Sequence, residues 1–170
     1  MMCQWVGIVA LSALALVTTS AHAQERVPVM EITRKQDQKI AEGLAEYFSG
    51  KVTITGQFQR EAPSRVSGAI VRFEPGARTA WHKHPLGQTL IVTEGVGWTQ
   101  VEGSPRQQFV VGDILWCPPE QKHWHGATLD GSMTHIAIQE SLNGSPVTWL
   151  EHVTEAEYLG ERDQPEAKRR

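Results

Sequence analysis

The sequence predicts an all-β protein, a single antiparallel sandwich or barrel with short flanking helices. Nine short runs between residues 52 and 153 are rich in β-branched and aromatic residues, and turn-forming pairs such as Pro75-Gly76 and Glu94-Gly95 separate them. The 170 residues suffice for one domain with a sizeable core and are too few for two. The expected strands cover residues 52–58, 68–73, 89–93, 97–101, 108–111, 114–117, 123–127, 133–139 and 147–153.

Two short helices are expected beside these strands. In Asp37–Phe48 the apolar residues recur at helical spacing, and Gly50 follows as a stop signal. Thr154 and Glu157 have the spacing of a capping box, which predicts a short last helix.

The first 23 residues are predicted to be a signal peptide. They contain no Lys, Arg, Asp or Glu, and the apolar run Val6–Val17 precedes the small-x-small triplet Ala21-His22-Ala23. Cleavage between Ala23 and Gln24 would export the mature protein to the periplasm or the medium. An uncleaved membrane anchor is the alternative, although the run is shorter than the roughly 20 residues of a spanning helix.

The rest of the chain is expected to divide into four parts. Residues 24–66 hold the first helix and strand, and residues 67–140 form the barrel core. Residues 141–160 hold the final strand and the short last helix, and the charged residues 161–170 form a frayed tail.

Composition excludes two features. The formal net charge of −3 and the lack of a basic patch argue against nucleic-acid binding. The expected mature chain keeps one cysteine, Cys117, so it cannot form an internal disulfide. We expect Cys117 to be a small buried apolar residue.

The histidines indicate a metal site. His82 and His84 are two residues apart, as are His123 and His125, so each pair projects from one side of a strand. If those sides face the inside of a small barrel, the imidazoles converge and suit manganese, iron, cobalt, nickel or zinc. Gln88 offers a neutral oxygen ligand close by. Taken singly, each histidine has the alternative of a surface or hydrogen-bonded core residue.

A second polar group is expected on the strand over residues 133–139. Met133, His135, Ala137 and Gln139 share one face of it, and buried polar groups cost roughly 1–3 kcal/mol each unless they are paired. One interpretation is a pocket lining in which His135 accepts or donates a proton. The alternative is a hydrogen-bond network that only orients the ligands.

These motifs resemble those of the cupin superfamily. The resemblance covers about residues 67–140 and implies a jelly-roll-like, double-stranded β-barrel with a metal inside it. The two matching motifs are Gly76-(x5)-His82-x-His84-(x3)-Gln88-(x6)-Gly95 and Gly112-(x5)-Pro118-(x4)-His123.

The sequence departs from the cupin pattern at three positions. The family usually has Glu at Gln88, Gly at Glu120 and Asn at Ala127. A divalent ion on three imidazoles and a carboxylate keeps one positive charge, whereas Gln88 in place of the carboxylate leaves two. We therefore expect a stronger Lewis acid that favours polarising a hydroxyl or carbonyl over redox cycling.

A narrower resemblance is to bacterial manganese-dependent cupin hydroxynitrile lyases, over residues 76–93, 122–126, 133–140 and 149–154. The exported N-terminus is a departure from that group. The resemblance implies one divalent ion per chain, manganese before iron, zinc, nickel or cobalt. The implied metal ligands are His82, His84, Gln88 and His123, and the implied substrate-side residues are Thr79, His125, His135 and Gln139.

The activity implied by this resemblance is cleavage or formation of cyanohydrins such as mandelonitrile. A cupin dioxygenase that uses iron or manganese, and a non-catalytic exported module that binds a small ligand, are the alternatives, because one barrel hosts many functions. The expected partners are a small-molecule substrate and further copies of the chain, as a homodimer or homotetramer. Outward-facing Ile136 and Ile138 are consistent with a subunit face. Neither nucleic acid nor, for the mature form, a membrane is expected.

Overall fold

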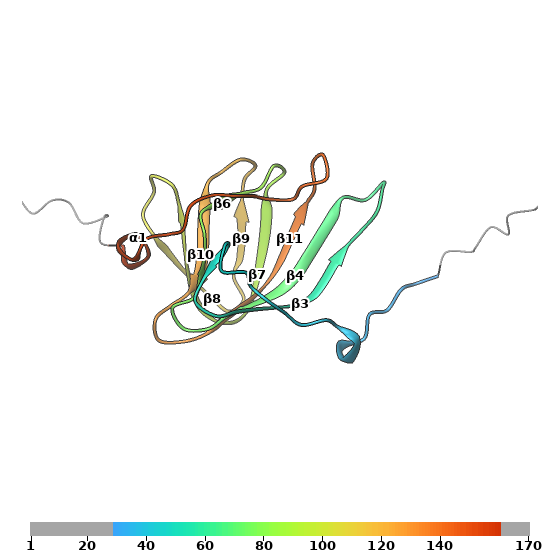
Figure 1. Ribbon diagram of the computed structural model, residues 1–170, viewed down its shortest axis with the longest axis horizontal. Helices are drawn as coiled ribbons and strands as arrows, with labels where there is room; N and C mark the ends of the chain where they lie inside the picture. The colour runs from blue at the N-terminus through green and yellow to red at the C-terminus, as the bar shows by residue number, and fades with distance from the viewer. Residues whose placement is uncertain (1–28, 161–170) are drawn as a thin grey trace, which may run out of the picture. The chain divides into compact units, whose positions relative to one another are not determined.

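Antiparallel strands make up most of the protein in a computed structural model, which describes residues 29–160 (Figure 1). The chain divides into two units, Met1–Ile32 and Thr33–Arg170; in the first, the described residues 29–32 are exposed and have no regular secondary structure. The expected signal peptide and charged tail lie outside the described residues. Within residues 29–160, no helix has the length and apolar character needed to span a membrane.

The elements follow the predicted all-β class. Two short helical segments flank the strands, η1 (Lys35–Asp37), a 3-10 turn, and α1 (Glu155–Leu159). The strands are β1 (Ala41–Glu42), β2 (Phe48–Ser49), β3 (Val52–Gln59), β4 (Val66–Phe73), β5 (Arg78–Thr79), β6 (His82–Lys83), β7 (Gln88–Val101), β8 (Gln107–Val110), β9 (Ile114–Cys117), β10 (His123–Ala127), β11 (Met133–Glu140) and β12 (Thr148–Trp149).

Strand β7 joins the two halves of the barrel. Its first part pairs with β11 and β9, beside β4, β3 and β1, and its second part pairs with β10 and β8. Strands β5, β6, β2 and β12 complete the second half around β10. All these pairs are antiparallel. The sheet curls around an interior, and both parts of β7 contribute residues to it.

The predicted break at Glu94-Gly95 is wrong, because β7 runs through it. Gly95 has a φ of 74°, and a Cβ atom there would lie 2.0 Å from the carbonyl oxygen of Ser132. The register with β11 shifts at the same level, between Thr134 and His135. A glycine in the left-handed region with a bulge opposite bends a strand without ending it.

The helix predicted over Asp37–Phe48 is also wrong. Ala41 and Glu42 pair with β3 instead, and the backbone N–H of Gly43 donates to the carbonyl oxygen of Val52. A glycine in a helix interior costs about 1 kcal/mol, so pairing with the sheet edge overrides a weak helical pattern. Two of its apolar residues, Ile40 and Leu44, stay exposed.

The last predicted strand, residues 147–153, is shorter than expected. Only Thr148 and Trp149 pair, and they do so with Lys83 and His82 of the two-residue strand β6. Beyond Trp149 the backbones of Leu150 and Glu151 bond only to Trp81, just before β6, so the strand does not continue.

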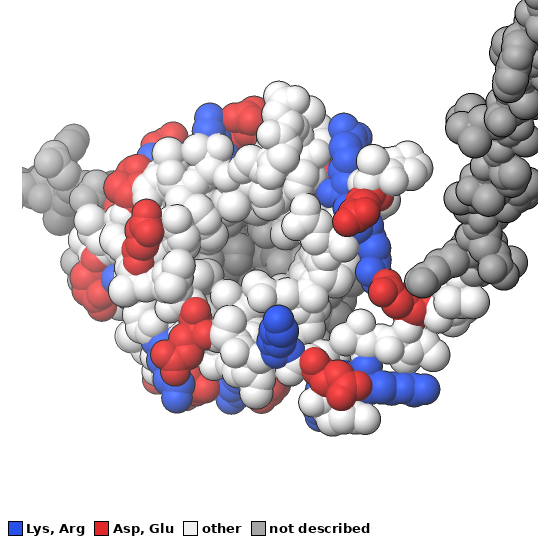
Figure 2. Space-filling model, turned by 45° about the vertical axis from the view of Figure 1, so that its right-hand side comes forward, with Lys and Arg blue, Asp and Glu red and all other residues white. Residues whose placement is uncertain are grey.

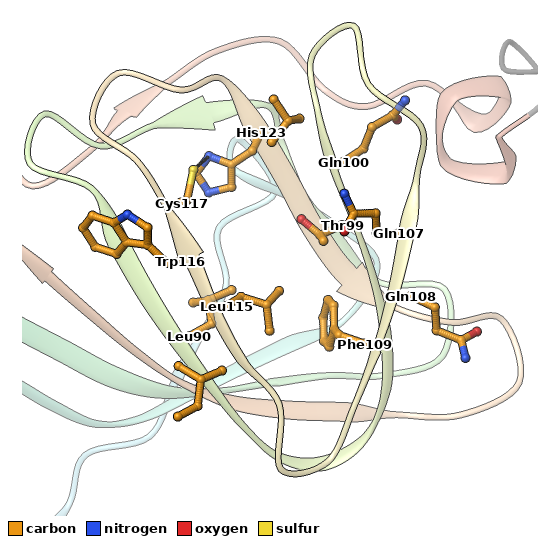
Figure 3. Close-up of a pocket in the computed structure, with 12 residues that line it drawn as sticks. Leu90, Thr99, Gln100, Gln107, Gln108, Phe109, Leu115, Trp116, Cys117 and His123 are labelled. Carbon is orange, nitrogen blue, oxygen red and sulfur yellow. Dashed lines mark hydrogen bonds between the residues drawn. The ribbon is translucent and has the colours of Figure 1, made fainter.

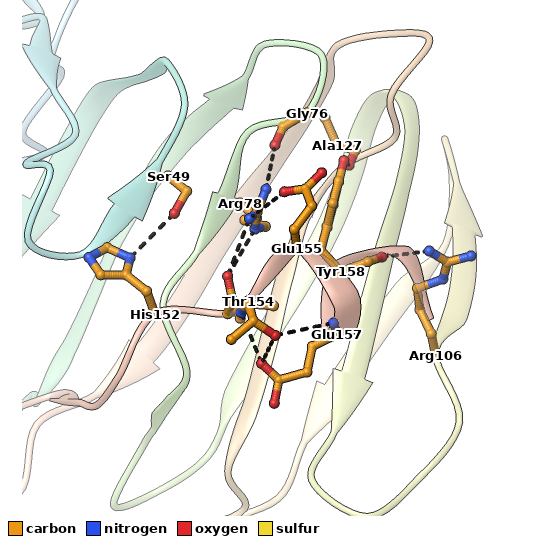
Figure 4. Close-up of polar contacts among 11 residues, drawn as sticks. Ser49, Gly76, Arg78, Arg106, Ala127, His152, Thr154, Glu155, Glu157 and Tyr158 are labelled. Carbon is orange, nitrogen blue, oxygen red and sulfur yellow. Dashed lines mark hydrogen bonds and ion pairs between the residues drawn. The ribbon is translucent and has the colours of Figure 1, made fainter. Parts of the chain in front are cut away.

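The predicted capping box of the last helix is confirmed (Figure 4). Thr154 Oγ1 accepts from the backbone N–H of Glu157, and Glu157 Oε2 accepts from the backbone N–H of Thr154. The buried Tyr158 of α1 donates its hydroxyl proton to the carbonyl oxygen of Ala127, 2.7 Å away. This bond ties the helix to the end of β10.

Two apolar clusters flank the interior. One lies between the halves of the barrel around Phe73, Val92 and Met133. The other packs Trp81 and Trp124 against Tyr158. Trp81 directly precedes His82 of β6, and Trp124 lies between His123 and His125 on β10, so this cluster lies on the side opposite to those histidines.

Candidate metal centre

Short strands from distant parts of the chain bring five histidines together. In the antiparallel register His123 of β10 lies directly opposite His82 of β6. Ring centroids are 4.2 Å apart for His82 and His123 and 4.9 Å apart for His125 and His135. All five side chains, His82, His84, His123, His125 and His135, are at most 3% exposed.

Three of these rings form a candidate metal site. Donor nitrogens of His82, His123 and His125 all lie within 4.8 Å of one another. From the sequence, His84 was expected in this group and His125 on the substrate side. The His84 ring centroid lies 5.2 Å from that of His82, and its buried Nε2 has no hydrogen-bond partner. The structure thus places both rings beside His82.

Hydrogen bonds to backbone carbonyls fix which ring nitrogen of each expected histidine ligand is free to bind a metal. A carbonyl oxygen only accepts, so a ring Nδ1 that bonds to one carries the proton and leaves the Nε2 lone pair free. The pairs are His82 with Ala80 at 2.9 Å, His84 with Pro146 at 2.7 Å and His123 with Gln121 at 3.0 Å. Three neutral imidazoles with free Nε2 atoms fit a borderline divalent ion.

A chain of side-chain bonds orients Gln88. Gln139 Nε2 donates to Ser67 Oγ at 3.2 Å, and Gln88 Nε2 donates to Gln139 Oε1 at 3.4 Å. The remaining atom, Gln88 Oε1, lies 3.4 Å from His123 Nε2. The amide oxygen therefore faces the histidines, as a neutral ligand would.

A cavity of about 190 Å³ opens beside the histidines. The nitrogens of His135 and Nδ1 of His125 are buried without hydrogen-bond partners. The Thr79 hydroxyl accepts from the backbone N–H of His125 at 3.2 Å. Figure 2 shows one face of the barrel hollowed, with the charged side chains around the hollow. The lining residues are Phe48, Ile54, Gln57, Ala69, Val71, Phe73, Thr79, His82, His84, Gln88, His125, His135, Ala137, Gln139, Val147 and Trp149.

Comparison with known proteins identifies the family. The cupin domain family matches residues 69–138. A curated (R)-mandelonitrile lyase from Granulicella tundricola is 54% identical over 129 residues, which cover 76% of this chain and 98% of the relative. The chain is a cupin.

Solved structures agree with this assignment. A cupin-like protein from Thermotoga maritima is 39% identical with a TM-score of 0.66, over 75% of this chain and 95% of the other. A polyketide cyclase from Streptomyces resistomycificus has a TM-score of 0.59 at 16% identity, over 81% of this chain and 95% of the other. The second likeness shows the fold alone.

Burial keeps the five clustered histidines of this cupin neutral. It lowers the pKa of His123 to about 4 and that of His135 to about 3. The pKa values of His82 and His125 fall well below the usual range, first because of burial and then because of the neighbouring imidazoles. Neutral rings are the form that binds a metal or accepts a proton.

A second cleft of this cupin, of about 280 Å³, lies between β8 and β9 and reaches His123 (Figure 3). Cys117 Sγ lies there, 3.0 Å from His123 Nδ1. Cys117 is only half-buried, and burial raises the pKa of its thiol to about 11, so it stays protonated. The expectation of a purely apolar role for Cys117 therefore missed its contact with a ligand-type histidine.

Ser67 and the carbonyl groups that hold the rings were not predicted from the sequence. Ser67 pairs with Gln139 in the register of β4 and β11. An alignment of these two strands on the hydrophobic pattern of the sequence would have placed the hydroxyl beside the amide. Pro146 gave no such signal, because it reaches His84 from a loop 62 residues away in the sequence.

Proposed function

We propose that this cupin is a metal-dependent hydroxynitrile lyase that cleaves cyanohydrins such as mandelonitrile and forms them in the reverse reaction. The observation that carries the proposal is His135, whose two ring nitrogens are buried without partners at the wall of the cavity. A histidine that only oriented a neighbour would use at least one nitrogen for that contact. The name of the Granulicella tundricola relative supports the same reaction.

The proposed metal ligands are His82, His84, His123 and Gln88, with one divalent ion per chain and manganese as the first choice. All four donors are neutral, which the hydrogen bonds of the three Nδ1 atoms and of the Gln88 amide support. When bound, the ion supplies positive charge that makes a substrate hydroxyl more acidic. His125 lies within the same cluster, so its ring is close enough to contact either the ion or the substrate.

His135 is the proposed proton carrier. Its neutral ring accepts the hydroxyl proton of the cyanohydrin, and the oxygen then forms the carbonyl double bond as the bond to the cyano carbon breaks. The electron pair of the broken carbon–carbon bond leaves with cyanide. Cyanide then takes the proton from the imidazolium of His135. Because the pKa of His135 is about 3, the ring is neutral before the step and returns the proton readily. The products are an aldehyde and hydrogen cyanide.

Thr79 and Gln139 have different parts in this proposal. The Thr79 oxygen accepts from the His125 backbone, which leaves its own proton available to a substrate oxygen or nitrogen. The Gln139 side chain is already bonded to Ser67 and Gln88. Gln139 therefore acts mainly as a positioning residue for Gln88.

The cavity suits a small substrate with an apolar part. Its volume of about 190 Å³ lies below the roughly 300–1,000 Å³ of sites for drug-sized ligands. Phe48, Phe73 and Trp149 form much of its apolar wall. An aryl ring such as that of mandelonitrile would bury its area against them.

The test is mandelonitrile cleavage by the purified, metal-loaded protein, followed as benzaldehyde and cyanide release with metal content measured on the same sample. His135→Ala should lower kcat at least about 100-fold with metal content unchanged. His152→Ala is the matched control, since His152 is exposed and bonds to Ser49. Absence of cleavage at full metal occupancy would reject the proposal, and oxygen consumption with a phenol or diketone would favour a dioxygenase instead.

A further inference from the structure

A β-bulge interrupts strand β3 beside the cavity. The register of β3 with β4 shifts between Thr55 and Phe58. Two residues, Gly56 and Gln57, therefore lie opposite the single residue Ala69. Gly56 has a φ of 58°, in the left-handed region that glycine adopts at little cost. A bulge of this kind adds one residue to a strand and re-aims the side chains that follow it.

The bulge turns the side chain of Gln57 toward the cavity. Ile54 lines the cavity, and in a regular strand the next inward positions would lie two and four residues further along. Instead Gln57, three residues further along, lines the cavity. Phe58 faces the outer side, where its ring covers Gly68, and a Cβ atom added at Gly68 would lie 2.7 Å from that ring. Without the bulge, Phe58 would point inward and Gln57 outward.

Gln57 marks the mouth of the cavity. Of the described residues that line the cavity, Gln57 alone is exposed, whereas the histidines at the inner end are at most 3% exposed. Ala69 lies opposite the bulge, and Ala137 lies opposite Ala69 on β11. These two residues also line the cavity and carry only methyl groups. A bound molecule therefore has room to extend from the histidines toward the amide of Gln57.

The Gln57 amide is a polar group in an apolar part of the wall. The lining side chains nearest to it in the sheet, Ile54, Ala69 and Val71, are apolar. No Asp, Glu, Lys or Arg within residues 29–160 lines the cavity. An amide donates a hydrogen bond through its nitrogen and accepts one through its oxygen, so it suits a neutral hydrogen-bonding group better than a charged one.

The orientation of the substrate decides which of its atoms meet this amide. In the proposed function the reacting hydroxyl group lies at the histidines, at the inner end of the cavity. The part of the substrate farthest from that hydroxyl group therefore lies at the mouth. In an aryl cyanohydrin this part is the ring position opposite to the carbon that carries the hydroxyl and cyano groups.

We propose that Gln57 is a specificity-determining residue, which selects aryl cyanohydrins with a neutral hydrogen-bonding group at the far end of the ring, together with the corresponding aldehydes. The proposal rests on the proposed function for the direction in which the substrate lies. Because the mouth is open to water, the amide of Gln57 replaces a hydrogen bond to solvent. The gain in affinity is therefore modest, about 3–10-fold.

The experiment measures, by calorimetry, the binding of 4-(hydroxymethyl)benzaldehyde and 4-ethylbenzaldehyde to the metal-loaded protein. The two aldehydes have nearly the same shape, and only the first has a hydrogen-bonding group at the far end of the ring. The ratio of their dissociation constants is compared between variants, because this comparison cancels the difference in hydrophobicity between the aldehydes. Gln57→Leu should shift the ratio about 3–10-fold toward the ethyl compound. Gln57→Glu, which keeps an acceptor for the hydroxyl group, should bind the hydroxymethyl compound more tightly than Gln57→Leu does.

Gln59→Leu serves as the control, since it is the same substitution at an exposed position of β3 outside the cavity lining. It should keep the wild-type ratio. An unchanged ratio in Gln57→Leu, an equal shift in Gln59→Leu, or no binding of either aldehyde to the wild type would overturn the proposal. Aldehyde binding requires no turnover, so it is separate from the mandelonitrile assay. A wild type that fails to cleave mandelonitrile but shows the expected shift in Gln57→Leu would reject the lyase reaction and support the contact made by Gln57.

Discussion

Gln88 donates from its Nε2 to Oε1 of Gln139 at 3.4 Å, and this bond decides which atom of Gln88 faces the histidines. With the amide nitrogen engaged, the oxygen is left 3.4 Å from His123 Nε2. A carboxylate, which most cupins have at this position, has no donor for Gln139 and cannot make the same contact. The amide of Gln88 therefore suits Gln139 as a hydrogen-bond partner in a way that a carboxylate would not.

Gln88→Glu is predicted to lower the kcat/KM for mandelonitrile about 10–100-fold, while metal content stays near one ion per chain. The substitution breaks the bond to Gln139, and its negative charge offsets part of the positive charge that acidifies the substrate hydroxyl. Kinetics and metal analysis on one preparation measure both effects. Gln108→Glu, at an exposed position on β8, is the control and should change neither. Unchanged activity in Gln88→Glu at unchanged metal content would contradict the role given to Gln88.

The metal-free protein is predicted to lose stability as the pH falls below about 6.5. This loss begins well above the pH of about 3 at which His135 is protonated in the folded state. In the folded state burial holds the pKa of His135 at about 3, whereas in the unfolded chain it is about 6.5. The contribution of His135 to the free energy of unfolding is complete above about pH 6.5 and is lost as the pH falls toward 3. Over this range the imidazole binds a proton in the unfolded chain and excludes it in the folded protein. Each such histidine adds a slope of up to about 1.4 kcal/mol per pH unit.

Denaturant unfolding of chelator-treated protein between pH 7 and pH 4 measures this slope. His135→Phe removes one of the buried titrating groups, so its free energy of unfolding should depend less steeply on pH than that of the wild type. Gln108→Phe, at an exposed position on β8, keeps all the buried histidines and should keep the wild-type slope. Equal slopes in the wild type and His135→Phe would show that the buried ring does not resist protonation.

Strand periodicity explains what the sequence could predict. The all-β class and the cupin barrel are confirmed, because turn pairs and alternating apolar residues are local signals. The same alternation placed His135, Ala137 and Gln139 on one side of a strand, and all three line the cavity. Positions set by one strand's own pattern were therefore accessible from the sequence.

Positions set by contacts between distant segments were not accessible. The helical spacing of Asp37–Phe48 was outweighed by pairing with β3 and by packing of Tyr47 and Phe48 on Trp149, about one hundred residues further along the chain. Spacing alone also could not show that the rings of His84 and His125 lie equally far from that of His82, with centroids 5.2 Å apart in both pairs. These distances depend on where β6 and β10 meet.

Metal removal is predicted to abolish cleavage and to lower stability. A chelator should leave the Nε2 atoms of the ligand histidines without a partner, as that of His84 is in the structure. An ion present at about 100 times its dissociation constant stabilises the fold by about 2.7 kcal/mol, which melting experiments with and without chelator detect. Manganese should restore activity and melting temperature together. His82→Ala, which lacks one ligand, should respond neither to the chelator nor to added manganese. Full activity of the wild type after exhaustive chelation would exclude a role for the metal.

Tyr158→Phe is predicted to lower the free energy of unfolding by about 1–2 kcal/mol without changing kcat/KM. The Tyr158 hydroxyl donates to the carbonyl oxygen of Ala127 at 2.7 Å, and both groups are buried (Figure 4). Its ring packs with Trp124 and Trp98, away from the cavity, so the loss should reach stability alone. Tyr158→Ala also removes the ring and should cost about 3–5 kcal/mol. Chemical denaturation measures the loss of stability, and the mandelonitrile assay measures any loss of activity. Equal losses of unfolding free energy in both variants would show that the hydroxyl, and not the ring, supplies the stability. A fall in kcat/KM for Tyr158→Phe would show that α1 is coupled to the histidines.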